Sequence, residues 1–217
     1  MRKEDRGNFI IAADVLAAFL GWTAAVRWID VEAIGPQGSA VGVASINQFV
    51  HRLTGVHMFL YTVTDWLSLV PVMLGTGFAF LGLMQWIRRR RLLSVDYSLL
   101  VLGGFYIAVM AAYILFEAAV VNYRPVLIDG ILEASYPSST TMLVMCVIPT
   151  SIMQFRDRIQ NRMIRRCVVT ACAVFMVFMV IGRLVSGVHW LTDIIGGALL
   201  SAGLVLMYRA VIRLRIG

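Results

Sequence analysis

The sequence predicts an all-α membrane protein built as a bundle of six transmembrane helices. Hydrophobic residues make up 60% of the 217-residue chain and charged residues only 14%, whereas soluble domains carry roughly 25% charged residues. A chain this apolar cannot bury its hydrophobic surface in one water-exposed globule, so it needs a lipid bilayer as solvent. Its basic residues cluster in short runs between apolar stretches, which argues against nucleic acid as a partner.

Six stretches have the length and composition of a membrane-spanning helix, which needs about 20 mostly apolar residues. They are residues 8–26, 58–87, 99–121, 138–155, 167–185 and 190–209. The second is long enough to be tilted, or to begin as an interfacial turn before it enters the membrane. No internal repeat or linker divides the chain, so we expect one domain covering residues 1–217.

The basic residues predict how these spans are oriented. Most of the 19 Lys and Arg residues fall on one side of a six-span threading. These are Arg2, Lys3, Arg6, Arg88, Arg89, Arg90, Arg91, Arg156, Arg158, Arg162, Arg165, Arg166, Arg209, Arg213 and Arg215. The positive-inside rule makes that side cytoplasmic, with both termini inside. Because the chain is compact and shows no targeting extension, we expect an integral protein of a bacterial cytoplasmic membrane.

The segment between the first two spans lies outside in this threading, and part of it has the apolar spacing of an amphipathic helix. Apolar residues recur at helical spacing within residues 46–60. They are Ile46, Phe49, Val50, Leu53, Val56 and Leu60. This pattern predicts an amphipathic helix lying at the outer membrane interface.

Residues suited to phosphate recognition fall at the outer ends of the later spans. Arg124 follows the third span and Arg183 ends the fifth; a guanidinium binds phosphate through two parallel hydrogen bonds. The fourth span opens with three hydroxyl residues, Ser138, Ser139 and Thr140. Backbone N–H groups at such a helix start would add donors at the positive end of the helix dipole. The threading therefore predicts an anion-binding patch on the non-cytoplasmic side.

A histidine and an aspartate open the sixth span on that same side. His189 and Asp193 are four residues apart, which places them on one face of a helix within reach of each other. A carboxylate in that position can fix the imidazole tautomer and support positive charge on the ring. The His189–Asp193 pair alone, or either arginine alone, also fits a structural role. The convergence of all four residues on one membrane face favours a functional site.

Three segments in this region resemble the signature motifs of the type 2 phosphatidic acid phosphatase (PAP2) superfamily. Residues 182–193, GRLVSGVHWLTD, are similar to the third motif, in which an Arg is followed by a His and then an Asp at this spacing. Residues 136–139, YPSS, resemble the second motif, and Arg124-Pro125 resembles the end of the first. The resemblance covers about residues 117–197, in the order of the family and with its six-span plan.

This resemblance implies a phosphatase of membrane lipids that uses neither metal nor cofactor. His189 would attack phosphorus to form a phosphohistidine, and Asp193 would orient the imidazole. Arg183 and Arg124, with Ser138 and the N–H groups near Ser139, would hold the phosphoryl oxygens. The site would open toward the outer leaflet, so its partner is a lipid phosphate or diphosphate presented there. The oligomeric state does not follow from the sequence.

The chain departs from the family motifs at two positions that matter for chemistry. Thr140 stands where the second motif has the His that protonates the leaving group, and Glu117 where the first motif has a Lys. A threonine hydroxyl does not titrate near neutral pH, and losing a general acid costs about 10²–10⁴ in rate. Ionised Glu117 would repel phosphate, whereas a protonated carboxyl would donate a hydrogen bond or the missing proton. Alternatively, Glu117 is structural and pairs with an arginine such as Arg124.

Other ionisable residues are further functional candidates, and two of them, His51 and His57, could replace the missing proton donor. Asp14 and Asp65 fall in or near the spans, where an ionisable residue is by default a functional candidate. His51 and His57 lie on the outer segment and would reach the site if that segment folds over it.

Three functions remain open from the sequence. One is a phosphatase suited to a diphosphate lipid such as a polyprenyl diphosphate, whose phosphate leaving group has a second pKa near about 6 and needs little protonation. The second is a phosphotransferase that passes the phosphoryl group to an acceptor other than water. The third is a binder or transporter of lipid phosphates that no longer turns them over. We favour the enzymatic functions.

Overall fold

The computed structural model describes residues 3–216, and the side chains of residues 6–214. The described chain is helical, with no strand longer than an isolated β-bridge, which confirms the all-α fold class. Its helices are α1 (Lys3–Trp28), α2 (Ala44–Thr54), α3 (Met58–Leu67), α4 (Leu69–Arg89), α5 (Tyr97–Ala118), α6 (Ser139–Arg158), α7 (Arg162–Val185) and α8 (Leu191–Ile216).

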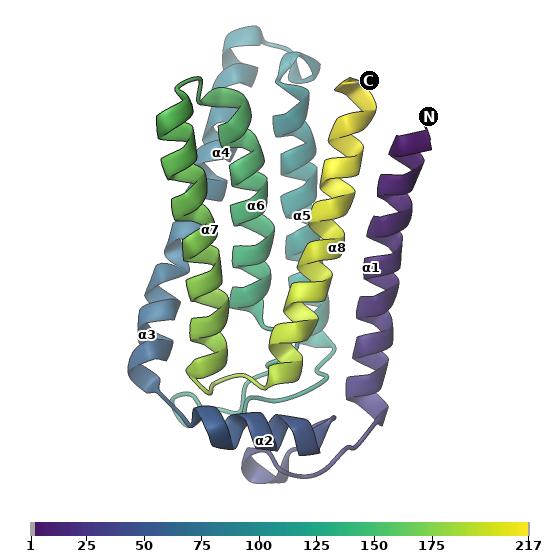
Figure 1. Cartoon of the computed structure of the whole chain (residues 1–217), viewed down its shortest axis with the longest axis vertical. Coiled ribbons are helices and arrows are strands. Elements are labelled where there is room, and N and C mark those ends of the chain that lie inside the picture. Colours follow the sequence, from purple (N-terminus) through teal and green to yellow (C-terminus); the bar gives the residue numbers. More distant parts are fainter. Residues whose placement is uncertain (1–2, 217) are drawn as a thin grey trace.

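The long helices run alongside one another, and α2 lies across one end of the bundle (Figure 1). Helix α6 is central, because it packs against α4, α5, α7 and α8, while α1 packs mainly against α8. The close approach of α1 depends on Gly203 of α8, where a Cβ would lie only 2.6 Å from the side chain of Leu16. The two ends of the described chain lie at the end of the bundle opposite α2 (Figure 1).

Within the described residues, five helical segments are long and apolar enough to cross a membrane. They are α1, the continuous stretch Met58–Arg89, α5, α7 and α8. The predicted fourth span, now α6, is not among them because it carries polar residues such as Thr150 and Gln154. Both are buried and contact neighbouring helices: the Thr150 hydroxyl lies 3.2 Å from the Tyr106 hydroxyl of α5, and Gln154 donates to the Tyr208 hydroxyl of α8 at 2.8 Å. These polar residues of α6 therefore face neighbouring helices rather than lipid.

Two predicted elements have different boundaries in the structure. The long second span is divided into α3 and α4 at Ser68, just before Pro71, which has no N–H to offer the preceding turn. The predicted interfacial helix over residues 46–60 ends at Thr54, so Val56 and Leu60 are not part of it. It ends there because Gly55 adopts a positive φ of 67°, a conformation that terminates helices.

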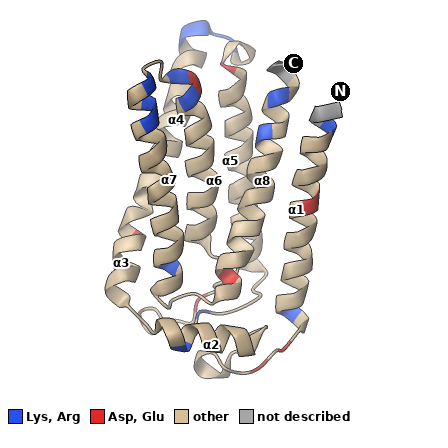
Figure 2. Cartoon of the chain, viewed as in Figure 1, with Lys and Arg blue, Asp and Glu red and all other residues tan. Residues whose placement is uncertain are grey.

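The charged residues are distributed unevenly along the bundle (Figure 2). The basic residues at the end of α4, at the α6–α7 turn and near the end of α8 gather at the end opposite α2. Arg183, in contrast, lies in the last turn of α7, near α2. Among the basic residues used above to predict orientation, Arg2, Lys3 and Arg215 lie outside the residues whose side chains are described.

Candidate active site

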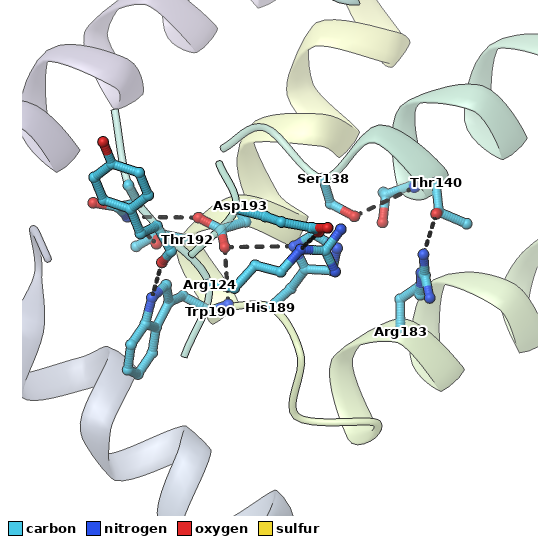
Figure 3. Close-up of polar contacts among 12 residues, drawn as sticks. Arg124, Ser138, Thr140, Arg183, His189, Trp190, Thr192 and Asp193 are labelled. Atoms are coloured by element: carbon cyan, nitrogen blue, oxygen red, sulfur yellow. Dashed lines mark hydrogen bonds and ion pairs between the residues drawn. The ribbon is translucent and has the colours of Figure 1, made fainter. Parts of the chain in front are cut away.

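The predicted site residues meet where the start of α6, the end of α7 and the start of α8 come together (Figure 3). Ser138 caps α6 by accepting a hydrogen bond from the Thr141 N–H at 3.5 Å. The Ser138 N–H in turn donates to the backbone carbonyl of Asp193 at 3.0 Å. These two contacts hold the hydroxyl-rich start of α6 against the first turn of α8.

His189 and Asp193 form the buried centre of this site. His189 Nδ1 lies 3.6 Å from Asp193 Oδ2, and the two side chains are 1% and 0% exposed. The carboxylate is fixed independently, because Oδ2 accepts the Trp190 N–H at 2.9 Å and Oδ1 lies 3.5 Å from the Asn122 side-chain nitrogen. Among the described residues, His189 Nε2 has no hydrogen-bond partner. One imidazole nitrogen thus faces a fixed carboxylate and the other is available.

Burial keeps His189 uncharged. Desolvation is the largest influence and lowers the pKa of His189 to about 4. The charges of Arg124 and Arg183 act in the same direction, whereas Asp193 opposes them. At neutral pH the imidazole is therefore neutral and keeps the lone pair that a nucleophile or base requires.

Arg183 is held from two sides at the end of α7. Its Nη2 donates to Thr140 Oγ1 at 2.5 Å on α6 and to Asp65 Oδ1 at 3.2 Å on α3. Nη1 lies 3.4 Å from the Thr64 hydroxyl. The side chain is 2% exposed, so its guanidinium is fixed in direction before any ligand binds.

Arg124 approaches the same place from the loop after α5. Its Nε lies 2.9 Å from Glu133 Oε2, an ion pair without the angle of a hydrogen bond. Among the described residues its Nη1 has no hydrogen-bond partner. The ring of Tyr61 lies beneath both guanidiniums, with the Arg183 and Arg124 Cζ atoms 4.9 and 6.0 Å from its centroid. An aromatic face attracts such cations, so Tyr61 supports the pair.

A cavity of about 360 Å³ lies against these two arginines. Its polar lining consists of Asp65, Ser68, Tyr113, Arg124, Ser139, Thr140 and Arg183, and the rest is apolar. A smaller pocket of about 20 Å³ lies beside it, lined by Glu117, Ser139 and His189 among others. Arg124 and Arg183 give the larger cavity a cationic wall, and its remaining lining is partly apolar. The neutral imidazole of His189 lines the adjacent small pocket. This arrangement can therefore accept a phosphate attached to an apolar group.

The structure does not pair Glu117 with Arg124, which was one of the two roles expected for this carboxyl. Arg124 pairs with Glu133 instead. Helix α5 ends at Ala118, and the chain beyond it is not helical, so the seven-residue helical spacing between Glu117 and Arg124 does not exist. Glu117 is exposed and lines the small pocket with His189.

The two outer histidines do not line the cavity. His51 on α2 contacts the Gly187 carbonyl at 3.1 Å and packs on the ring of Trp190. His57 contacts the Thr54 carbonyl at 2.8 Å. Of the two acidic candidates, Asp14 is exposed on α1 and Asp65 lines the cavity. Only Asp65 among these four residues lines the cavity with Arg124 and Arg183.

Sequence reasoning missed Tyr61, Glu133 and Asn122, which support the site from outside the three motifs. Tyr61 lies one helical turn before Asp65 and therefore on the same helix face. Placing Asp65 in the site would also have placed Tyr61 there. Glu133 and Asn122 belong to the loop between α5 and α6, where no periodic pattern assigns a direction to a side chain. Within the described residues, no group of three or more His, Cys, Asp or Glu side chains could hold a metal ion.

Comparisons with known proteins agree with this geometry. The model of the PAP2 superfamily matches residues 121–216, a range that includes the second and third motif segments. Among solved structures, the chain is similar to a transmembrane PAP2-type phosphatidylglycerolphosphate phosphatase from Bacillus subtilis, with a TM-score of 0.60 and 20% identity over 92% of this chain and 93% of that one. No curated protein matches. The resemblance expected from the motifs is confirmed, and the bundle has the transmembrane PAP2 fold.

Proposed function

We propose that this chain, which carries the PAP2 superfamily match and fold, hydrolyses lipid phosphates and diphosphates at the non-cytoplasmic face of a membrane. The observation that carries the proposal is the buried, neutral His189 placed 3.6 Å from Asp193 beside an arginine-lined cavity. A general anion-binding pocket needs the arginines only. The fixed carboxylate behind the imidazole is an arrangement for activating a nucleophile.

The reaction proceeds in two steps. His189 Nε2 attacks the terminal phosphorus while Asp193 stabilises the charge that develops on the imidazole. The bond from that phosphorus to the leaving oxygen breaks, which releases the lipid alcohol from a monoester or the lipid monophosphate from a diphosphate. Arg124 and Arg183 bind the phosphoryl oxygens, where charge accumulates in the transition state. Water then attacks the phosphohistidine, releasing inorganic phosphate and restoring His189.

The leaving group determines which lipids react fastest. Thr140 donates no proton near neutral pH, and its hydroxyl already accepts a hydrogen bond from Arg183. A polyprenyl diphosphate expels a phosphate ester, whose second pKa near about 6 makes it a good leaving group without protonation. A monoester such as phosphatidate or phosphatidylglycerol phosphate expels an alkoxide, which needs a proton. We therefore expect the diphosphate to react faster than either monoester.

The charge distribution supports an outward-facing site. Basic residues gather at the end of the bundle opposite α2 (Figure 2), and the positive-inside rule assigns such an end to the cytoplasm. The site residues lie at the other end, so the substrate phosphate is presented from the outer leaflet. A bacterial cytoplasmic membrane with both termini inside is the location we propose.

Two other functions use the same residues differently. A phosphotransferase would pass the phosphoryl group from His189 to an acceptor other than water. A binder or transporter would use Arg124 and Arg183 alone, and the replacement of the usual proton donor by Thr140 is the observation that favours it.

Phosphate release by the purified protein in detergent separates these functions. The substrates are a polyprenyl diphosphate, phosphatidate and phosphatidylglycerol phosphate. The matched variants are His189→Ala and Asp129→Asn, which removes a charge from an exposed loop position outside the site. We expect release that is fastest from the diphosphate, lost in His189→Ala and retained in Asp129→Asn. Retained lipid binding without release from any substrate would instead identify a binder.

A further inference from the structure

Asp65 is the acidic group of the cavity whose position the PAP2-like motifs do not explain. It lies on α3, outside the motif region, and its side chain is 56% exposed within the structure although it lines the cavity. Its Oδ1 and Thr140 Oγ1 are both bonded to the same nitrogen, Arg183 Nη2. The carboxyl group is thus adjacent to Thr140, the residue that stands where the family motif has its proton donor.

We propose that Asp65 donates the proton to the leaving oxygen of lipid phosphate monoesters. This inference rests on the proposed phosphatase function and adds to it the group that makes monoesters reactive. Glu117 is the rival carboxyl group, but it shares the small pocket with His189. In a displacement at phosphorus the nucleophile and the leaving oxygen lie roughly in line on opposite sides. A carboxyl group beside the nucleophile is therefore poorly placed, whereas Asp65 lines the larger cavity with both arginines, and His189 does not line that cavity.

Binding of the substrate provides the change that Asp65 needs in order to act as an acid. In the empty site its carboxylate is the counter-ion of Arg183. A phosphate dianion that binds Arg183 competes for that cation and brings negative charge close to the carboxylate. A nearby like charge favours the protonated form of a carboxyl group, which is the form that the proposed proton transfer requires. The charged and titratable groups that line the cavity with it are Arg183 on α7, Arg124 in the loop after α5 and Tyr113 on α5. Tyr61 lies one turn earlier on α3.

The proton balance closes over one turnover. In the first step the bond between His189 Nε2 and phosphorus forms, the phosphorus–oxygen bond of the ester breaks, and the Asp65 proton passes to the departing oxygen to give the lipid alcohol. In the second step the Asp65 carboxylate accepts a proton from the water that attacks the phosphohistidine. The nitrogen–phosphorus bond breaks and phosphate leaves, which restores His189 and returns Asp65 to the protonated form from which the first step began.

The test compares Asp65→Asn with the unmodified protein on substrates that differ in their leaving group. We expect kcat for phosphatidate to fall by roughly 10²-fold or more, within the range for loss of a general acid. Turnover of the polyprenyl diphosphate should fall by less than about tenfold, because its leaving group needs little protonation. Asp129→Asn is the charge-matched control outside the site, and Asp65→Glu should recover part of the phosphatidate activity.

Specific outcomes would overturn this inference. An equal loss on both substrates would assign Asp65 to holding Arg183 in place, and no loss would remove it from the reaction. Selective loss of phosphatidate turnover in Glu117→Gln would assign the proton to Glu117. His189→Ala separates the two proposals, since activity that survives it contradicts the phosphatase mechanism itself.

Discussion

His189 experiences opposing influences from its surroundings. Burial and two nearby arginines disfavour its charged form, while Asp193 favours it, and burial prevails. In the proposed mechanism this balance changes when a phosphate binds, because an anion would neutralise the two arginines and developing positive charge on the imidazole would then meet only Asp193. The proposal therefore requires a site that keeps the imidazole neutral when empty and stabilises it during phosphoryl transfer.

The titration of His189 is a direct check on its burial. Because the pKa of His189 is lowered to about 4 from an ordinary value of 6.5, its imidazole should stay neutral through pH 5 in the folded protein. NMR of histidine-labelled protein in detergent measures this, with the signal assigned from its absence in His189→Ala. The unfolded chain would take up this proton near its ordinary pKa, so this residue's contribution to stability should be lost as pH falls from about 6.5 toward about 4. A titration midpoint near 6.5 would contradict the burial described here.

At the scale of elements, helix α2 is part of the active-site structure. Asn47, fully buried on α2, donates from Nδ2 to the Gly42 carbonyl and to Thr192 Oγ1, both at 2.9 Å. Its Oδ1 accepts the Thr192 N–H at 3.2 Å. Since Thr192 precedes Asp193 in the first turn of α8, one side chain ties α2 to the turn that carries Asp193.

Asn47→Ala should therefore weaken both folding and catalysis. It leaves buried groups of Thr192 and Gly42 without a partner, which costs about 1–3 kcal/mol. We expect a lower melting temperature and a reduced kcat, because the turn that carries Asp193 loses its support. Gln48→Ala, at the neighbouring position of the same helix, is the control and should change neither. An Asn47→Ala protein with normal stability and turnover would show that α2 is not coupled to the site.

The turn between α7 and α8 depends on a glycine. Gly187 has a φ of +70°, and a Cβ there would lie 1.9 Å from the carbonyl oxygen of Gly55. An alanine must both adopt the left-handed conformation, at about 1–2 kcal/mol, and push away the backbone that links α2 to α3. Gly187→Ala should lower the melting temperature and displace His189, two residues later. Gly104→Ala on α5, where a Cβ meets nothing within 4 Å, should be tolerated. Equal melting temperatures for the two variants would contradict this close packing.

At the scale of the whole molecule, the fold was more predictable than the contacts within the site. The helical bundle follows from apolar stretches of the right length, and the cluster of motif residues follows from their positions at span ends. The role of α6 could not be obtained in this way, because its Thr150 and Gln154 side chains are bonded to other helices. Contacts between Arg183 and Asp65 join residues distant in sequence, so no spacing rule predicts them. The expected Glu117–Arg124 contact failed because it assumed a helix that ends at Ala118.

The orientation of the whole bundle is testable by thiol labelling. Two single substitutions serve, Ser45→Cys on α2 and Leu93→Cys in the α4–α5 turn, both at exposed positions. They are made in a chain with Cys167 and Cys172 replaced by alanine, since Cys146 is buried. In intact cells a membrane-impermeant maleimide should label position 45 and not position 93. Both should react after permeabilisation, and the reverse pattern would place the active site in the cytoplasm.

The most direct test of the mechanism is detection of the covalent intermediate. The purified protein is mixed with a polyprenyl diphosphate, quenched within the first turnovers under alkaline conditions that preserve phosphohistidine, and analysed by mass spectrometry. The account predicts a phosphoryl group on the peptide that contains His189, and its absence in His189→Ala. Substrate turnover without phosphorylated His189, or turnover that persists in His189→Ala, would contradict it.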